Sequence, residues 1–366
     1  MQPNLLCTAR RLFIPAAVFF MFFGAIEHFH YLLTVEAGEG FHRTYLLTSY
    51  YMNYFDFGFV KRGVLATFLA PILNLFEGGV TEGIFVITLV NILSILTLIV
   101  IAHKALKTVR SHTLETMLRI VLVLSPAGVA QPGYDFLRLD SWAFIAFIGS
   151  AYFLVKRKFL VSGVILGIGV MTHEALFVFG FPVIAAGVLI IHASPGEKLT
   201  SLGPAVLAAF AVFLFGNAAI DVESALPAEV NEAAIVWTRG LLEPSLNLPI
   251  YYYPIFAFYF AVPMGILSVF YVQNGYRLDP LLLAPVACLA LFGLGYDYAR
   301  WGHIMLVSVL VAMILKISLT DKSVRFRASG ALFPVMAIYL LPLGPIGIIQ
   351  PLPLTHRIVE EVIERI

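Results

Sequence analysis

The segment that decides the fold is GIFVITLVNILSILTLIVIA, which occupies residues 83–102. It contains no charged residue, and it is bounded by Glu82 on one side and by His103 and Lys104 on the other. The hydrocarbon core of a bilayer is about 30 Å thick, so an α-helix needs about 20 consecutive apolar residues to cross it. The segment therefore predicts a transmembrane helix over 82–103.

The rest of the chain repeats this pattern. Of its 366 residues, 60% are hydrophobic and 12% are charged, whereas an average globular chain is about 25% charged. So few charges cannot cover the surface of a soluble protein of this length. The apolar residues come in blocks of about 16 to 23 residues, which is the length of a membrane span. The composition therefore predicts an all-α, polytopic membrane protein.

We expect about eleven transmembrane helices in a single transmembrane domain that comprises residues 1–366. The predicted ranges are 11–33, 82–103, 115–131, 141–155, 159–173, 175–192, 202–220, 250–271, 279–296, 302–317 and 329–350. Gly163 and Gly167 lie one helical turn apart in the fifth of these. This spacing indicates a close contact between helices rather than a ligand site.

The short apolar stretch 63–76 decides the topology. If it crossed the membrane, the basic residues Lys104, Lys107 and Arg110 would lie outside the cell. If it lies along the interface as an amphipathic helix, these residues and the later basic loops are cytoplasmic. The positive-inside rule favours the second arrangement, with a cytoplasmic N-terminus. We expect external loops at 34–81 and 221–249, and an interfacial C-terminal helix over 355–366, where apolar residues share one face.

Polar side chains from distant segments collect at the predicted outer face. A charge near lipid is costly, so each one needs a partner, water or a function. The segments are the end of the first span with Glu27, His28 and His30, the loop stretch Asp56–Gly63, and the stretches Tyr134–Asp140, Thr172–Glu174 and Tyr296–Trp301. Acids, arginines, histidines and tyrosines in apolar surroundings suit chemistry on a phosphate-bearing molecule at the lipid–water boundary.

Asp56 is the first candidate for a catalytic role. A carboxylate on an interfacial loop can deprotonate an incoming hydroxyl that lies within hydrogen-bond reach. The alternative is a helix cap, or a partner for Lys61 or Arg62. These two cations either bind phosphate or anchor the loop to anionic lipid.

Arg300 and Arg138 are the candidates for phosphate binding, because a guanidinium matches phosphate oxygens with two parallel hydrogen bonds. Asp297 lies three residues before Arg300, and on a helix the two share a face and pair. Asp135 and Asp140 flank Arg138 in the same way. In each case a simple ion pair is the competing interpretation.

His173 and Glu174 are candidates for proton transfer or substrate binding. As neighbours on a helix they point about 100° apart, so they cannot both face one ligand squarely. His173 donates to a phosphate or sugar, carries a proton, or satisfies a backbone group at the helix end. Asp56, Asp135, Asp140 and Asp297 could also converge on a divalent cation, although no spacing demands one. There is no HExxH, P-loop or GxGxxG motif, so the sequence gives no support for nucleotide or zinc chemistry of the soluble type.

The arrangement resembles the GT-C superfamily of membrane glycosyltransferases. The resemblance rests on a first span that runs outward, a long first external loop with an early aspartate, and many later spans with polar residues gathered outside. The matching segment is Tyr50–Phe76, and Asp56 stands where that superfamily has its catalytic aspartate. The outer arginine-bearing ends are also similar to bacterial polysaccharide polymerases and O-antigen ligases.

The resemblance implies a sugar donor linked to polyprenyl phosphate, with loop helices that form the jaw of the active site. It implies a glycan or lipid-linked acceptor, no nucleic acid, and a bacterial inner (cytoplasmic) membrane with membrane lipids around the protein. Asp56 would be the base, and Arg300, Arg138, Lys61 or His173 would stabilise the leaving phosphate. Polymerisation or ligation of diphosphate-linked repeat units is one alternative, a flippase for lipid-linked saccharide is a second, and a non-catalytic assembly subunit is a third.

Overall fold

The computed structural model describes residues 3–34, 48–76, 80–109, 111–125, 127–216, 252–293, 298–319 and 334–337. Over these residues the chain is helical, and they contain no strand. The longer helices are α1 (Pro3–Thr34), α5 (Val80–Leu106), α6 (His112–Leu124), α8 (Asp140–Val155), α9 (Phe159–Thr172), α11 (Phe181–Ile190), α12 (Pro195–Phe215), α15 (Tyr252–Gln273) and α17 (Tyr298–Leu319). The shorter elements are α3 (Tyr54–Phe57), α4 (Gly63–Leu73), η1 (Asn74–Phe76), α7 (Ala130–Tyr134), α10 (Ala175–Phe179), α16 (Pro280–Leu283) and η3 (Ala284–Gly293).

Three of the described helical segments are long and apolar enough to cross a membrane: Gly83–Leu106, Pro195–Phe215 and Arg300–Leu319. Most other predicted spans coincide with shorter apolar helices. The predicted span 175–192 is divided at Gly180 into α10 and α11, and 279–296 is divided into α16 and the 3₁₀ helix η3.

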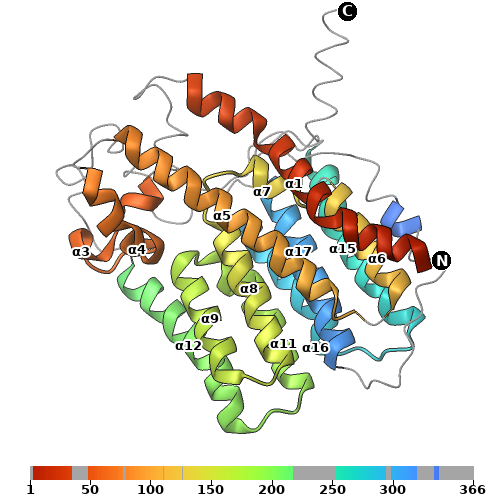
Figure 1. Cartoon of the computed structure of the whole chain (residues 1–366). Coiled ribbons are helices and arrows are strands. Elements are labelled where there is room, and N and C mark those ends of the chain that lie inside the picture. Colours follow the sequence, from red (N-terminus) through yellow and green to blue (C-terminus); the bar gives the residue numbers. More distant parts are fainter. Residues whose placement is uncertain are drawn as a thin grey trace, which may run out of the picture.

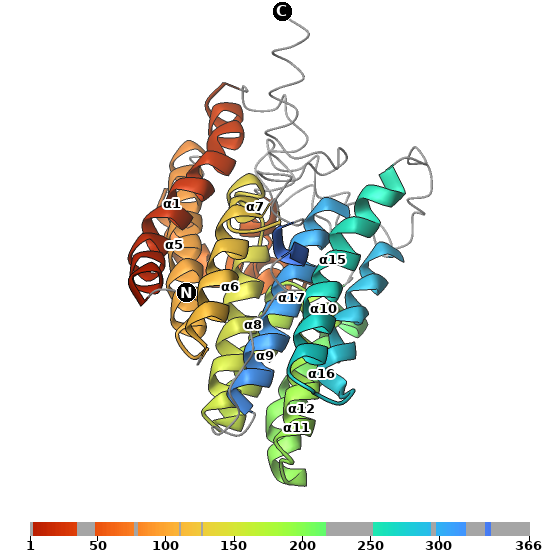
Figure 2. The same cartoon turned by 90° about the vertical axis from the view of Figure 1, so that its right-hand side faces the viewer.

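Helix α17 forms the centre of the bundle. In its most apolar stretch 78% of the residues are buried, against 28% in the corresponding stretches of α5 and α12. Its neighbours include α15, η3, α11 and α8, and Figures 1 and 2 show it enclosed among them. A residue on α17 is therefore shielded from the surroundings of the bundle, to which α5 and α12 are partly exposed.

Helices α8, α9 and α12 form an antiparallel layer on one side of α17 (Figure 1). A Cβ atom on Gly163 would lie 2.2 Å from the carbonyl oxygen of Thr200, and one on Gly167 would lie 3.0 Å from that of Pro204. The predicted close helix contact is confirmed: α9 and α12 approach so closely because these positions carry no side chain.

We call the end of the bundle where α9 ends and α8 and α17 begin the outer end, after the predicted topology. Figure 2 shows α7 and the first residues of α15 toward this end, and the α11–α12 connection at the opposite end. At the opposite end, buried Glu115 accepts hydrogen bonds from Arg10 at 2.8 and 2.5 Å and from Arg119 at 3.0 and 2.7 Å. These contacts join α1 to α6.

The described part of the first loop packs against the outer end. Helix α4 contacts α9 and α3, and the amide of Lys61 donates to the carbonyl of Gly216 at the end of α12. Leu65 and Leu69 on α4 are buried, whereas Phe68 on its other side is 74% exposed. An apolar helix with one buried and one exposed face agrees with the expected position at a membrane interface.

Several predictions lie outside the described residues. They are the parts 35–47 and 77–79 of the first loop, the external loop 221–249, the C-terminal helix 355–366, Asp297, and the span 329–350 except for 334–337. The side chains of Glu27, His28 and His30 also lie outside the description.

Candidate functional site

Seven of the predicted site residues lie together at the outer end: five form a chain of contacts, and the Asp135–Arg138 pair lines a pocket with two of those five, Asp140 and Arg300. We call this set the outer network. Its members come from the turn before α4, the α9–α10 turn, the α7–α8 turn and the first turns of α8 and α17: Arg62, Asp135, Arg138, Asp140, His173, Glu174 and Arg300.

Arg62 and Glu174 tie the first loop to the bundle. Nε and Nη2 of Arg62 donate to Oε2 and Oε1 of Glu174 at 2.8 and 2.5 Å. Burial alone would raise the pKa of Glu174, but the charge and hydrogen bonds of Arg62 lower it well below its usual range. Arg62 has a φ of +63°, a conformation that costs a non-glycine residue roughly 1–2 kcal/mol. The bidentate ion pair stabilises this strained position.

His173 and Asp140 connect that pair to α17. The amide of Ala175 donates to Nδ1 of His173 at 3.3 Å, so in the neutral ring Nε2 carries the proton. This Nε2 lies 3.5 Å from Oδ1 of Asp140, and Oδ2 of Asp140 accepts from Nη1 of Arg300 at 3.3 Å. His173 therefore faces Asp140 while Glu174 faces Arg62. The two are not neighbours on a helix as predicted, because α9 ends at Thr172 and His173 has an extended backbone.

Asp135 and Arg138 form a buried ion pair in the outer network. Nε of Arg138 lies 3.5 Å from Oδ1 of Asp135, and Nε2 of Gln131 donates to its Oδ2 at 2.9 Å. Both members of the ion pair are buried. Burial raises the pKa of Asp135 to about 6, although the charges of Arg138 and Arg300 oppose the shift. Asp135 is thus a carboxyl group that takes up and releases a proton close to neutral pH.

Arg138 and Arg300 line the same small polar pocket, together with Asp135, Asp140 and His303. The turn between α7 and α8 that carries Arg138 is strained, because Leu137 has a φ of +71°. The buried hydroxyl of Tyr50 lies 2.9 Å from the carbonyl oxygen of Leu137 and 2.8 Å from Oδ1 of Asn91. Tyr50 therefore connects the first loop to this turn and to α5. Strained backbone that neighbouring contacts hold in place is concentrated at functional sites.

Asp56 lies apart from the outer network. Its side chain is exposed, and Nδ2 of Asn53 donates to its Oδ2 at 2.7 Å. Oδ1 of Asn53 in turn accepts from the amides of Phe55 and Asp56 and so caps α3. Among the described residues, Asp56 forms no ion pair, so neither Lys61 nor Arg62 is its partner. Asp56 is a carboxylate that is oriented from one side and open to solvent.

The side chain of Lys61, the other predicted cation of the first loop, has a shifted pKa. Burial lowers the pKa of Lys61, and the charge of Glu174 opposes this shift.

The described part of the chain contains no group of three or more acidic, histidine or cysteine side chains placed to hold a metal ion. Asp135 and Asp140 instead face Arg138 and Arg300.

His303 is a site residue that the sequence analysis missed. Its Nδ1 lies 2.6 Å from the carbonyl oxygen of Ala127, and its ring meets the ring of Phe144 edge-on at 4.7 Å. Its Nε2 is buried and has no hydrogen-bond partner among the described residues, which costs about 1–3 kcal/mol. A histidine inside a predicted span is the signal that could have identified it, because polar groups in membrane segments are rare and functional.

A comparison with models of protein families, with curated proteins and with solved structures finds no match for this chain. Function is therefore inferred from the site itself.

Proposed function

We propose that the protein is a membrane glycosyltransferase that takes a sugar from a polyprenyl-phosphate donor at the outer face. The observation that carries this proposal is that Arg138 and Arg300, from distant segments, line one pocket at the outer end, each beside a carboxylate. Two guanidinium groups at a lipid–water boundary suit a lipid phosphate, because their planar donors match its oxygens.

The carboxylates set the charge of this pocket. Asp140 orients Arg300, and Asp135 balances Arg138. A pKa of about 6 allows Asp135 to take up a proton when an anionic phosphate enters. The pocket then keeps both positive charges for the leaving phosphate without adding a second buried negative charge.

Asp56 is the proposed base for the acceptor hydroxyl. Asn53 holds one oxygen of its carboxylate, and the side chain is exposed where an acceptor arrives from solvent. The Arg62–Glu174 pair fixes the loop that carries Asp56 to the α9–α10 turn. In this assignment Glu174 positions Arg62, and His173 positions Asp140. A single base without a covalent intermediate gives inversion at the anomeric carbon.

The proposal includes the eleven-span topology, with a cytoplasmic N-terminus in a bacterial inner membrane. A polymerase or ligase that uses diphosphate-linked units would use the same two arginines, and the released product, diphosphate or monophosphate, separates these cases. A saccharide flippase is a weaker candidate, because the cavity below the polar pocket is lined by apolar side chains. Transport of a sugar requires polar groups near the membrane midplane to hydrogen-bond it, and an apolar cavity does not supply a row of such groups.

The test is release of polyprenyl phosphate from polyprenyl-phosphate hexoses by the protein in nanodiscs, with a membrane lipid extract as acceptor. Replacing the proposed base in Asp56→Asn should lower the rate by about 10²–10⁴-fold without changing the melting temperature. The matched control is Glu197→Gln on α12 at the opposite end, where the carboxylate accepts from the amide of Ser194 in a capping box. Glutamine can make the same hydrogen bond, so this variant should retain the rate. Equal rates in Asp56→Asn and the wild-type protein would remove the proposed base.

A further inference from the structure

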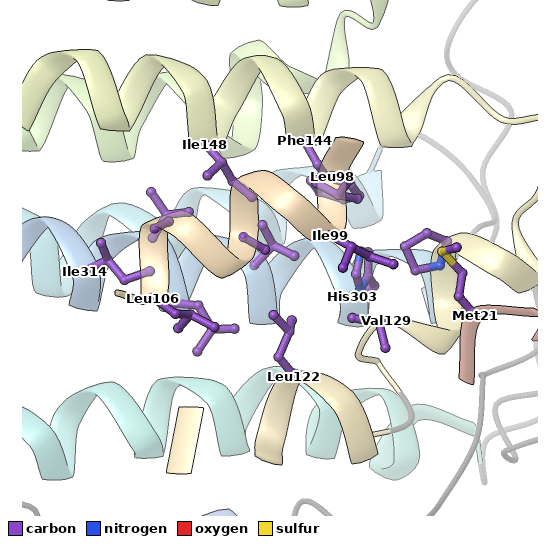
Figure 3. A pocket seen from close by; sticks show the side chains of 16 residues that line it. Met21, Leu98, Ile99, Leu106, Leu122, Val129, Phe144, Ile148, His303 and Ile314 are labelled. Carbon is purple, nitrogen blue, oxygen red and sulfur yellow. The ribbon is translucent and has the colours of Figure 1, made fainter. Parts of the chain in front are cut away.

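A cavity lies in the core of the bundle directly below the polar pocket. It has a volume of about 60 Å³ between α5, α8 and α17, and α1, α6 and α7 close its other sides. Figure 3 shows Ile314 at one end of it and His303 with Met21 at the other. One water needs a volume of about 10–15 Å³, so the cavity is larger than a single water requires.

The lining of this cavity is apolar. Apart from His303, its walls are aliphatic, aromatic, proline and methionine side chains, such as Leu98, Ile99, Leu106, Leu122, Ile148 and Ile314. A water in such a site lacks the two to four polar partners that it needs, and apolar cavities of this kind stay dry and bind apolar molecules. The walls therefore select hydrocarbon over water, ions or sugar.

The cavity is the middle member of a row of three. It shares Pro132, Phe144 and His303 with the polar pocket at the outer end. At its other end it shares Ala105, Ile148, Val311 and Ile314 with a second cavity of about 160 Å³, which Ser318 and Lys156 also line. From His303 to Ser318, α17 rises about 22 Å. The free space is therefore elongated along the bundle axis.

His303 stands in the wall between the polar and the apolar parts of this row. The Nδ1–H group of His303 donates a hydrogen bond to the carbonyl of Ala127, so in the neutral ring Nε2 is a hydrogen-bond acceptor. The side chain is 4% exposed, and Nε2 has no partner within the described residues. A buried acceptor at the boundary between hydrocarbon and arginines is placed to meet an O–H group.

We propose that this row of cavities binds one single-chain amphiphile, with its hydrocarbon chain along α5, α8 and α17. Nε2 of His303 accepts a hydrogen bond from an O–H of the head group, which lies toward Arg138 and Arg300. The shared group is an O–H, which a fatty alcohol from the bilayer, a protonated fatty acid and a monoprotonated isoprenyl phosphate all carry. Binding does not rest on glycosyl transfer, and it is measured without turnover.

The probe is a sixteen-carbon alcohol with a photoreactive diazirine near its chain end, added to the full-length protein in nanodiscs. After irradiation, peptide mass spectrometry locates the labelled residues. Because the head group lies at His303, the chain end lies in the second cavity, so we expect labelling on the segments 105–108 and 311–318 that line it. We expect excess unlabelled alcohol to suppress this labelling. Labelling confined to lipid-facing side chains such as Leu93 and Phe210, or labelling that no competitor suppresses, would overturn the proposal.

Competitors and variants refine this result. Suppression by hexadecanoic acid alone assigns the site to a bilayer lipid, and suppression by polyprenyl phosphate assigns it to an isoprenoid. Ala102→Phe fills the cavity and should abolish labelling. Leu93 lies on the same helix but is 53% exposed, so Leu93→Phe should leave labelling unchanged. His303→Leu should weaken binding about tenfold, the equivalent of one hydrogen bond. Full labelling of a folded Ala102→Phe variant would contradict the assignment. If that variant does not fold, the positions labelled in the wild-type protein decide whether the row of cavities is occupied.

Discussion

Arg62 combines two features that are costly separately: a left-handed backbone and a largely buried charge. The φ of +63° aims its side chain toward Glu174, and the two hydrogen bonds to that carboxylate neutralise the guanidinium. The first loop thereby gains a fixed attachment to the α9–α10 turn. The attachment predicts a strong energetic coupling between two residues that are 112 positions apart in the sequence.

Glu174→Gln should destabilise the protein by about 2 to 4 kcal/mol, because it leaves a partly buried guanidinium without its counter-ion. Arg62→Gln should have a similar effect, and the double variant should cost less than the sum of the two. Unfolding of the four proteins in detergent gives the coupling free energy. Purely additive losses would show that the pair contributes nothing of its own.

Asp135 predicts a pH dependence of stability. Its pKa is about 6 in the folded protein, against a reference of 3.8, so between these values the native state binds more protons than the unfolded chain. The resulting contribution, about 3 kcal/mol, is fully present below about pH 4 and is lost as the pH rises through 6. The melting temperature of the wild-type protein should fall relative to that of Asp135→Asn between about pH 4 and pH 7. A constant difference would contradict a raised pKa.

The sequence analysis named all seven members of the outer network, but of their pairings it anticipated only that of Arg138 with Asp135. Costly charges near lipid identify Arg300 and Asp140 as residues that need partners. Their contact spans 160 positions, and no local spacing reports that α8 and α17 begin side by side. His303 lies two residues beyond the polar stretch Tyr296–Trp301, inside a predicted span, and a single imidazole in an apolar segment is a weaker signal than a cluster of polar residues.

At the scale of elements, the α9–α12 contact depends on one face of α9. The carbonyl oxygens of Thr200 and Pro204 occupy the space that side chains at Gly163 and Gly167 would fill. The spacing of the two glycines predicts this contact, because small residues one turn apart allow helices to approach closely.

Gly163→Ala should destabilise the protein by about 1–3 kcal/mol, because its Cβ would overlap the backbone of α12. The matched control is Gly149→Ala on α8, where the nearest atom to the new Cβ is a side-chain carbon of Ile165 at 3.7 Å. That control should be neutral or stabilising, because alanine favours a helix over glycine. Thermal unfolding of both variants measures the difference, and equal melting temperatures would show that α12 shifts without cost.

Apolar periodicity predicts where helices lie but not where they break. The predicted span 279–296 is divided because α16 ends at Leu283, just before Ala284 and Pro285. Ala284 keeps helical backbone angles, with a φ of −54° and a ψ of −41°, but Pro285 has no backbone N–H to continue the α-helical hydrogen bonds. The division of 175–192 falls at Gly180, where a Cβ would lie 3.1 Å from the side chain of Phe147 on α8. Contacts with another helix are not visible in the sequence pattern.

At the scale of the whole molecule, two kinds of space are stacked in one bundle. The outer end holds paired charges and the exposed Asp56, and the core below holds an apolar cavity enclosed by α5, α8 and α17. A lipid with a phosphate head matches both parts at once, since each part fits one end of the molecule. This division of polar and apolar space is the basis of the proposed function.

The most direct test is a structure of the full-length protein in nanodiscs with bound polyprenyl phosphate. The proposed function predicts that the phosphate lies within hydrogen-bond distance, about 3 Å, of the guanidinium of Arg300 or Arg138, on the side of the bundle that carries Asp56. A phosphate bound at the opposite end, near Lys156 or Lys316, would contradict the proposed function.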